Sequence, residues 1–249
     1  MALPDESIEM KAIIKSLIAR TGYRVIRRTD MNRFQAIEEC MSGLGARAYR
    51  PRVIVDGGAH LGQFALLARK TFPDAEEFHL FEPQQACLEP LRKLCASERF
   101  VLHECALSGR PGTLRFLRTE QPNTGAHVVE DEAAATLVEA RTLDEVFETK
   151  LDRGCRALLK LDLQGHELDA LRGGAKSLRS IEVVLTEVSF YVQSHVPMAA
   201  EIIAFMGGIG FVLYDVASLS GRRRDNRLRE GDLVFVRQDS PLLEDRRWE

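Results

Sequence analysis

A glycine-rich turn that starts with an acid is the segment of this sequence best suited to bind a ligand. Residues 53–55 are apolar, and the turn Asp56-Gly57-Gly58-Ala59-His60-Leu61-Gly62 follows them directly. A buried strand, a glycine turn and a helix in this order let backbone N–H groups approach a nucleotide-like ligand closely. A second acid, Glu82, ends the next apolar run twenty residues after Gly62, where nucleotide-binding folds place a carboxylate on ribose hydroxyls. The two features together predict a nucleoside cofactor site.

The chemistry of the turn distinguishes between two classes of cofactor. A dinucleotide fingerprint has a glycine where this chain has Ala59, and Asp56 would repel the pyrophosphate of NAD. S-adenosylmethionine has no phosphate and carries a cationic sulfonium and an amino group, which a nearby carboxylate attracts. We therefore expect S-adenosylmethionine as the cofactor. The residues of this chain expected to contact it are Asp56, Gly58, His60, Gly62 and Glu82.

Two further acids, Asp162 and Glu187, end apolar runs later in the chain and are candidates for catalysis. The carboxyl ends of parallel strands share one edge of a sheet, so both acids are expected on the ligand side. Methyl transfer to an oxygen requires an aligned acceptor and removal of its proton. We expect Asp162 to position cofactor or acceptor, with His166 or Glu187 nearest to the role of base.

Several polar residues also have plainer interpretations. Glu167 suits the first turn of a helix, where an acid stabilises the helix dipole, and His166 suits a solvated cap. Asp162, Glu167 and Glu187 offer three oxygens for Mg²⁺ or Ca²⁺, but their spacing matches no dedicated cation loop, so we expect no resident metal. The arginines within residues 222–229 are interpreted as part of a solvated loop in preference to a site for an anionic acceptor.

The composition is that of a soluble enzyme and argues against several classes of function. The 249 residues carry a net charge of -3 at pH 7, which gives no electrostatic reason to expect a nucleic-acid partner. No apolar run approaches the ~20 residues of a membrane span, and residues 1–20 lack the pattern of a signal peptide. Five cysteines without a Cys-x-x-Cys pair indicate neither a disulfide framework nor a zinc site. We expect a cytoplasmic protein that acts on a small-molecule or glycan acceptor.

Alternating strand and helix patterns place these residues on one large α/β domain. Apolar runs predict strands at 53–55, 77–82, 100–105, 157–163 and 182–188. Helical spacing predicts helices at 7–19, 36–44, 63–71, 85–96, 143–147, 167–178 and 199–206. Alternating segments predict an antiparallel ribbon of 112–117 with 135–140, and an antiparallel pair of 210–216 with 232–237 at the sheet edge. The expected organisation is an N-terminal helical extension (1–50), a methyltransferase domain (51–238) and a C-terminal tail (239–249).

Taken together, the motifs resemble those of the FkbM family of S-adenosylmethionine-dependent methyltransferases. The resemblance covers residues 53–237 and rests on the glycine turn, Phe81-Glu82-Pro83, Ala106-Leu107-Ser108, Thr142-Leu143-Asp144, and the segments at 159–167 and 231–235. It implies a class I methyltransferase fold, a Rossmann-like three-layer sandwich with a mostly parallel seven-stranded sheet whose last strand is antiparallel. It also implies methyl transfer, mostly to a hydroxyl of a sugar or secondary metabolite, and adds Ala106 and Leu107 as residues near the adenine.

Two departures from the family pattern keep other functions open. Gln164 stands where the family often has Glu, and His60 replaces the more usual Asn of the turn. A class I fold that binds the cofactor without transferring a methyl group is therefore one alternative. The other alternative is a nicotinamide-dependent oxidoreductase, in which a pyrophosphate would have to tolerate Asp56 and Ala59.

Overall fold

The computed structural model describes residues 17, 21, 33–98, 100–117, 119–130, 135–192, 196–222 and 224–245. The chain divides into two compact units, Met1–Asn32 and Arg33–Glu249, and the second contains the elements described below. The helix predicted at 7–19 lies outside the described residues apart from Leu17. The expected boundaries at residues 50 and 238 stay a prediction.

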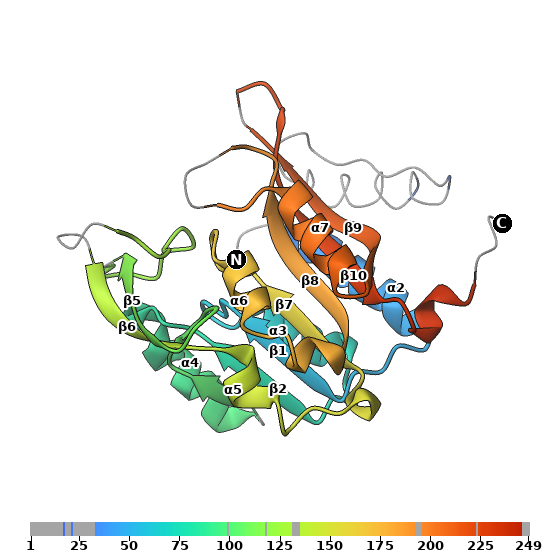
Figure 1. Cartoon of the computed structure of the whole chain (residues 1–249), viewed down its shortest axis with the longest axis horizontal. Coiled ribbons are helices and arrows are strands. Elements are labelled where there is room, and N and C mark those ends of the chain that lie inside the picture. Colours follow the sequence, from blue (N-terminus) through green and yellow to red (C-terminus); the bar gives the residue numbers. More distant parts are fainter. Residues whose placement is uncertain are drawn as a thin grey trace, which may run out of the picture. The chain divides into compact units, whose positions relative to one another are not determined.

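A seven-stranded sheet forms the centre of the fold, with the strand order β3-β2-β1-β7-β8-β10-β9 (Figure 1). The strands are β1 Val53–Gly57, β2 Glu77–Phe81, β3 Phe100–His103, β7 Ala157–Leu161, β8 Ile181–Ser189, β9 Phe211–Gly221 and β10 Leu228–Arg237. The first five strands in this order are parallel, whereas β10 is antiparallel to both β8 and β9. This topology confirms the class I methyltransferase fold expected from the sequence.

Helices cover both faces of the sheet and produce three layers (Figure 1). One face packs against α2 Arg33–Ala46, α3 Gln63–Thr71 and α4 Gln85–Ser97, and the other against α5 Leu143–Phe147, α6 Glu167–Arg172 and α7 Ala199–Gly208. Successive strand residues therefore enter different cores, as Val55 and Ile54 do. Burial on both faces explains why the parallel strands appear as continuous apolar runs in the sequence. No helix in the described part of the chain is long and apolar enough to cross a membrane.

The predicted antiparallel ribbon is present as part of a second, smaller sheet. It consists of β4 Ala106–Leu107, β5 Gly112–Leu117 and β6 Ala135–Arg141 in the order β4-β6-β5. The strand predicted at 100–105 is shorter than predicted, because β3 ends at His103 and the chain continues into β4, which pairs with β6 in the smaller sheet. All five cysteines are free thiols.

Several other predicted boundaries were wrong, and the strand predicted at 157–163 ends at Leu161. The helix predicted at 167–178 ends at Arg172 and is followed by Gly173, where a Cβ would lie 2.2 Å from the carbonyl oxygen of Ser108. A short 3-10 turn, Ser177–Arg179, completes the segment, and two further 3-10 turns lie at Arg153–Cys155 and Pro241–Leu243. The edge pair is longer than predicted, since β9 continues to Gly221 and β10 begins at Leu228.

Helix α2 ties the beginning of this unit to the sheet. It is longer than the predicted 36–44 helix and buries Ile37, Met41 and Leu44, which lie on one side of the helix. This side packs against α3 and β9. Its first residue, Arg33, reaches the acids at the ends of β7 and β8.

Candidate functional site

The glycine turn, residues 56–62, joins β1 to α3 at the carboxyl edge of the sheet. Gly58 and Gly62 adopt left-handed conformations with φ of 75° and 81°, which favour glycine. A Cβ on Gly58 would lie 2.0 Å from the carbonyl oxygen of Asp162, and a Cβ on Gly62 would lie 2.4 Å from Leu94 Cδ2. The turn is therefore confined between the end of β7 and α4, with no room for a side chain at either glycine.

A buried lysine, Lys160 on β7, holds the start of the turn and lies opposite Asp56 in the sheet register. Its ammonium donates hydrogen bonds to Asp56 Oδ1 at 2.9 Å, to Gly57 O at 3.1 Å and to Gly58 O at 2.8 Å. The side chains of Lys160 and Asp56 are only 8% and 1% exposed. Burial raises the pKa of Asp56, an effect that Lys160 counteracts. Sequence reasoning missed Lys160, although a single charge inside the apolar run 157–161 was a usable signal.

Glu82 follows β2 and connects that strand to the turn. One carboxylate oxygen accepts a hydrogen bond from the His60 N–H at 2.7 Å, and the other accepts one from the Gln84 N–H at 2.8 Å. Burial raises the pKa of this carboxyl group. The ring nitrogen Nε2 of His60 is also buried and has no hydrogen-bond partner among the described residues. A polar ligand at the turn would supply the missing partner.

Ala106 and Leu107, expected near an adenine, form the short strand β4 and are buried. Leu107 lies against the turn, because its Cδ1 is 3.0 Å from the position that a Cβ on Gly57 would take. The amide oxygen of Gln84 accepts a hydrogen bond from the Asn123 N–H at 2.7 Å, which brings the segment after β5 to the Glu82 side of the turn. Sequence reasoning did not identify Gln84.

Three acids at the carboxyl edge surround one guanidinium, and we call Asp162, Glu187 and Asp232 the carboxylate cluster. Arg33 Nη1 lies 2.9 Å from Asp162 Oδ2 and 3.2 Å from Glu187 Oε1. Arg33 Nε and Nη2 bind the two oxygens of Asp232 at 2.7 and 2.5 Å, and Ser218 Oγ also donates to Asp232. The structure thus brings Asp162 and Glu187 together as predicted and adds Arg33 and Asp232, which the sequence reasoning had not identified.

Gln164 lies between the two central acids of the cluster. Its Nε2 donates hydrogen bonds to Asp162 Oδ1 at 2.9 Å and to Glu187 Oε2 at 3.0 Å. The backbone of Gln164 has φ of 53° and that of Gly165 has φ of 104°, so the chain turns sharply after β7. An amide at this position donates to both acids, whereas a carboxylate would add a further negative charge.

Burial and neighbouring charges together move the pKa values of Asp162 and Glu187 in opposite directions. Burial acts to raise the pKa of Asp162, but Lys160 and Arg33 outweigh it and hold that pKa below its ordinary value. Burial, followed by the negative charge of Asp162, raises the pKa of Glu187 well above its ordinary value. Near neutral pH, Asp162 is the ionised member of the pair and Glu187 the protonated one.

His166 makes its contacts outside the carboxylate cluster. Its Nε2 lies 3.1 Å from Ser108 Oγ, and its Nδ1 lies 3.7 Å from Asp169 Oδ2. Burial lowers the pKa of the ring, with Asp169 acting against this effect. The contacts anchor the start of α6 to the segment after β4, so Glu187 and Asp162 are better placed than His166 to act on one ligand atom.

Glu167 supports the backbone at the start of α6. Its carboxylate accepts hydrogen bonds from the N–H groups of Leu163 at 2.7 Å and Gly165 at 3.1 Å, and burial raises its pKa to about 7. Oxygens of Asp162, Glu167 and Glu187 lie within 4.8 Å of one another, a spacing that could suit a metal ion. In this structure these oxygens are already engaged by a guanidinium, the Gln164 amide and backbone N–H groups.

The basic loop between β9 and β10 makes mostly local contacts. Arg222 pairs with Asp225, and Arg229, at the start of β10, lies with its Nη2 2.8 Å from Glu230 Oε2. The guanidinium of Arg227 lies over the Tyr191 ring at 4.3 Å. These contacts are consistent with the interpretation as a charged surface loop.

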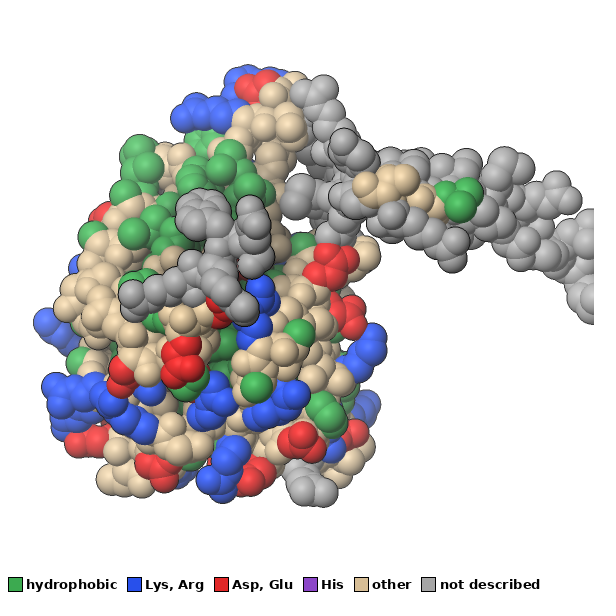
Figure 2. Space-filling model, turned by 90° about the vertical axis from the view of Figure 1, so that its right-hand side faces the viewer, with side chains coloured by type: hydrophobic (Ala, Val, Ile, Leu, Met, Phe, Trp, Pro, Cys, Tyr) green, Lys and Arg blue, Asp and Glu red, His purple; other side chains and the backbone are tan. Residues whose placement is uncertain are grey.

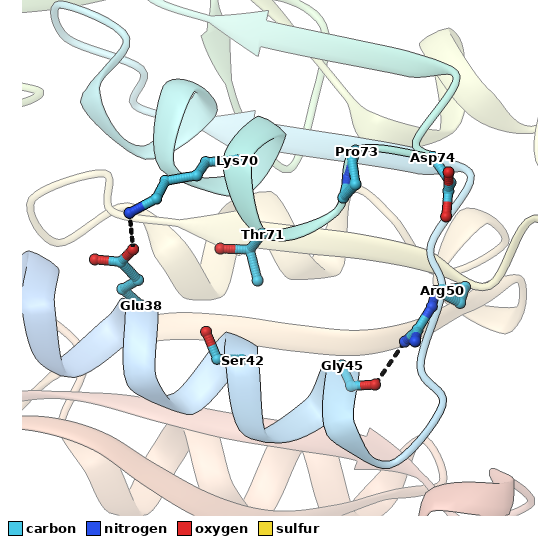
Figure 3. A pocket seen from close by; sticks show the side chains of 8 residues that line it. All are labelled: Glu38, Ser42, Gly45, Arg50, Lys70, Thr71, Pro73 and Asp74. Atoms are coloured by element: carbon cyan, nitrogen blue, oxygen red, sulfur yellow. Dashed lines mark hydrogen bonds and ion pairs between the residues drawn. The ribbon is translucent and has the colours of Figure 1, made fainter.

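A hollow of about 460 Å³ lies between α2 and α3, away from the glycine turn (Figure 3). It is lined by Glu38, Ser42, Gly45, Arg50, Lys70, Thr71, Pro73 and Asp74. Arg50 and Asp74 precede β1 and β2, which places the hollow toward the amino ends of these strands. Lys70 pairs with Glu38 at 2.6 Å. No residue predicted for the site lines it.

Comparison with known proteins gives a family match over most of the site. The model of the methyltransferase FkbM domain matches residues 56–213, which is more than half of the chain. No curated protein matches the sequence. The match begins at Asp56 and includes Glu82, Asp162 and Glu187.

Several solved methyltransferases are similar to the chain at low identity. A methyltransferase FkbM from Methylobacillus flagellatus KT is 16% identical with a TM-score of 0.47, and the match covers 74% of this chain and 43% of that one. A putative RNA methyltransferase from Pyrococcus horikoshii is 12% identical, with 83% of each chain covered and a TM-score of 0.48. The 1,6-didemethyltoxoflavin-N1-methyltransferase of Burkholderia thailandensis, solved with S-adenosylhomocysteine, is 16% identical with a TM-score of 0.42. That match covers 96% of this chain and 92% of that one. The chain spans less than half the length of the first of these proteins.

Proposed function

The chain belongs to the FkbM family of methyltransferases, and from this premise we propose that it transfers the methyl group of S-adenosylmethionine to a hydroxyl of a sugar or secondary metabolite. The observation that carries the proposal is the contact between the glycine turn and the end of β7. Because Gly58 packs on the carbonyl of Asp162, a cofactor held by the turn and an acceptor held by Asp162 would be neighbours. Proximity and alignment are the main requirements of an in-line methyl transfer.

The residues proposed for the cofactor suit its polar groups. Glu82 offers a carboxylate to the ribose hydroxyls, and it is already oriented by two backbone N–H groups. His60 Nε2, buried without a partner among the described residues, would meet the carboxylate of the methionine portion. Asp56, Gly58 and Gly62 shape the turn, and the remaining proposed contacts near the adenine are Ala106 and Leu107.

The acceptor would be positioned and deprotonated by the carboxylate cluster. S-adenosylmethionine supplies, when bound, a carbon already activated by its sulfonium. We assign Asp162 the role of accepting the hydroxyl proton, because it is the ionised acid beside the turn and is partly accessible. Glu187, which retains a proton near neutral pH, would orient the acceptor by hydrogen bonding. His166 is proposed to shape the site through Ser108 without taking the proton.

A small acceptor is supported by the charge distribution. On the face in Figure 2, acidic and basic side chains are interspersed, with no broad area of one sign. The whole chain is slightly acidic, with a net charge of -3. Neither property favours a polyanionic partner such as nucleic acid.

A calorimetric comparison of cofactors tests the proposed function. S-adenosylhomocysteine and NAD are titrated separately into the full chain. The proposal predicts saturable binding of S-adenosylhomocysteine and no binding of NAD. Binding of NAD alone would overturn it and favour the oxidoreductase. Tight S-adenosylhomocysteine binding, without methyl transfer to any hydroxyl compound, would instead favour a non-catalytic binding protein.

A further inference from the structure

We propose that Lys160 is a positioning residue that sets the shape of the glycine turn and thereby the affinity for the cofactor, an inference that rests on the proposed function. Lys160 comes from β7, whereas the turn follows β1. All three hydrogen-bond acceptors of its ammonium belong to consecutive residues, Asp56, Gly57 and Gly58. The lysine therefore holds the first three residues of the turn from the neighbouring strand.

The geometry excludes direct participation of Lys160 in binding or chemistry. A lysine ammonium has three N–H donors and no acceptor, and each donor has a partner within 3.1 Å. The side chain is 8% exposed. No donor remains for a cofactor or an acceptor, so the residue acts through the backbone that it holds.

A lysine suits this position better than the apolar residues around it in the strand. The carboxylate of Asp56 is buried beside it, and an apolar side chain would leave that charge without its cationic partner inside the protein. The carbonyls of Gly57 and Gly58 would also each lose a donor. The Gly57 carbonyl would keep the backbone N–H of Asp162 as a donor, whereas the donor recorded for the Gly58 carbonyl is the Lys160 ammonium.

Lys160 also connects the turn to the acceptor side of the proposed site. The carbonyl of Gly57 accepts one hydrogen bond from Lys160 Nζ and another from the backbone N–H of Asp162, both at 3.1 Å. Asp162 is only two residues after Lys160 in the same segment. One backbone carbonyl thus joins the residue that shapes the turn to the residue assigned to the acceptor.

The test compares S-adenosylhomocysteine binding in three variants with the wild type. Lys160→Met removes all three hydrogen bonds, and Asp56→Asn with Lys160→Met removes the charge of Asp56 as well. Lys176→Met is the matched control, because Lys176 forms an exposed surface pair with Glu148. Calorimetry gives the dissociation constant, and thermal unfolding without ligand reports on the fold.

The proposal predicts that both variants lacking Lys160 bind S-adenosylhomocysteine about tenfold to hundredfold more weakly than the wild type, while Lys176→Met binds normally. If Lys160→Met does not fold, the double variant is compared with Asp56→Asn alone, because Asp56 is itself one of the residues proposed for the cofactor, and the double variant must then bind more weakly than Asp56→Asn. Wild-type affinity in the double variant would overturn the proposal and show that Lys160 only neutralises Asp56. Lack of binding by the wild type would instead count against the proposed function.

Discussion

Replacing Arg33 with methionine should destabilise the fold in a pH-dependent manner. The substitution removes the only guanidinium that contacts Asp162, Glu187 and Asp232 among the described residues. A hydrogen bond to a charged partner contributes ~1.5–3 kcal/mol, and removing one partner of a buried ion pair costs ~3–5 kcal/mol. Because the Arg33 side chain is 33% exposed, we expect a loss of about 2–4 kcal/mol in the free energy of unfolding near neutral pH.

The pH dependence follows from the two shifted acids. Asp162 has a lowered pKa, so it stabilises the folded state above its ordinary pKa of 3.8, and this contribution disappears as pH falls. Glu187 has a raised pKa, so its stabilising contribution is present below 4.5 and is lost as pH rises. Without Arg33, the pKa of Asp162 loses one cause of its lowering, so the benefit from Asp162 shrinks, whereas Glu187 stays protonated near neutral pH in both proteins. The deficit of the variant should therefore be present at neutral pH and narrow as pH falls below about 4, where Asp162 becomes protonated.

Urea unfolding followed by circular dichroism at several pH values measures this deficit. Arg92→Met is the control, because Arg92 pairs with Glu104 on the surface, where the two side chains are 53% and 39% exposed. Its loss should be about 0–1 kcal/mol. Two results would contradict this prediction. One is a loss in the free energy of unfolding for Arg33→Met that is no larger than the loss for Arg92→Met, and the other is a loss for Arg33→Met that is the same at every pH.

Two further predictions concern the turn. Glu82→Ala should weaken S-adenosylhomocysteine binding by about tenfold to hundredfold, since the ribose loses a charged acceptor and the N–H groups of His60 and Gln84 lose theirs; unchanged affinity in titration calorimetry would remove Glu82 from the site. Gly58→Ala should lower both thermal stability and S-adenosylhomocysteine affinity, because its Cβ would meet the carbonyl oxygen of Asp162 at 2.0 Å with φ at 75°. Gly207→Ala, where a Cβ meets nothing within 4 Å, is its control, and equal melting temperatures for the two variants would contradict the packing argument.

The main sheet could be predicted from the sequence because its strands are buried on both faces. The runs at 53–55 and 182–188 carry this pattern directly, and their strands lie where the pattern indicated. Boundaries that depend on tertiary contacts were less predictable. The end of α6 is set by the approach of Gly173 to Ser108, and the division between β3 and β4 is set by pairing with a strand about thirty residues later.

The predicted acids of the candidate site could be found because each follows an apolar run in the sequence. The residues that pair with these acids could not be predicted. Arg33 lies 129 residues before Asp162 in sequence, and no local periodicity connects the two residues. Asp232 becomes a member of the cluster because the antiparallel register places it opposite Glu187. These contacts come from the sheet topology and the packing of α2.

The ion pair between Asp56 and Lys160 changes the role expected for Asp56. From the sequence, its carboxylate was expected to attract a cationic cofactor and repel a pyrophosphate. In the structure, Lys160 pairs with this carboxylate at 2.9 Å, so much of its charge is balanced inside the protein. The preference for S-adenosylmethionine therefore rests more on the family match and on the positions of Glu82 and His60 than on the charge of Asp56.

A labelled-methyl assay tests the central claim most directly. Wild-type protein and Asp162→Asn are incubated with S-adenosylmethionine carrying a labelled methyl group and with sugar and metabolite hydroxyl acceptors, and the products are identified by mass spectrometry. The Asn side chain keeps the shape of Asp162 but cannot accept the proton as a carboxylate does. We predict labelled methyl ether from the wild type and little or none from a variant that still binds S-adenosylhomocysteine. Equal turnover by the two proteins would contradict the assignment of Asp162, and label on no hydroxyl acceptor would contradict the proposed reaction.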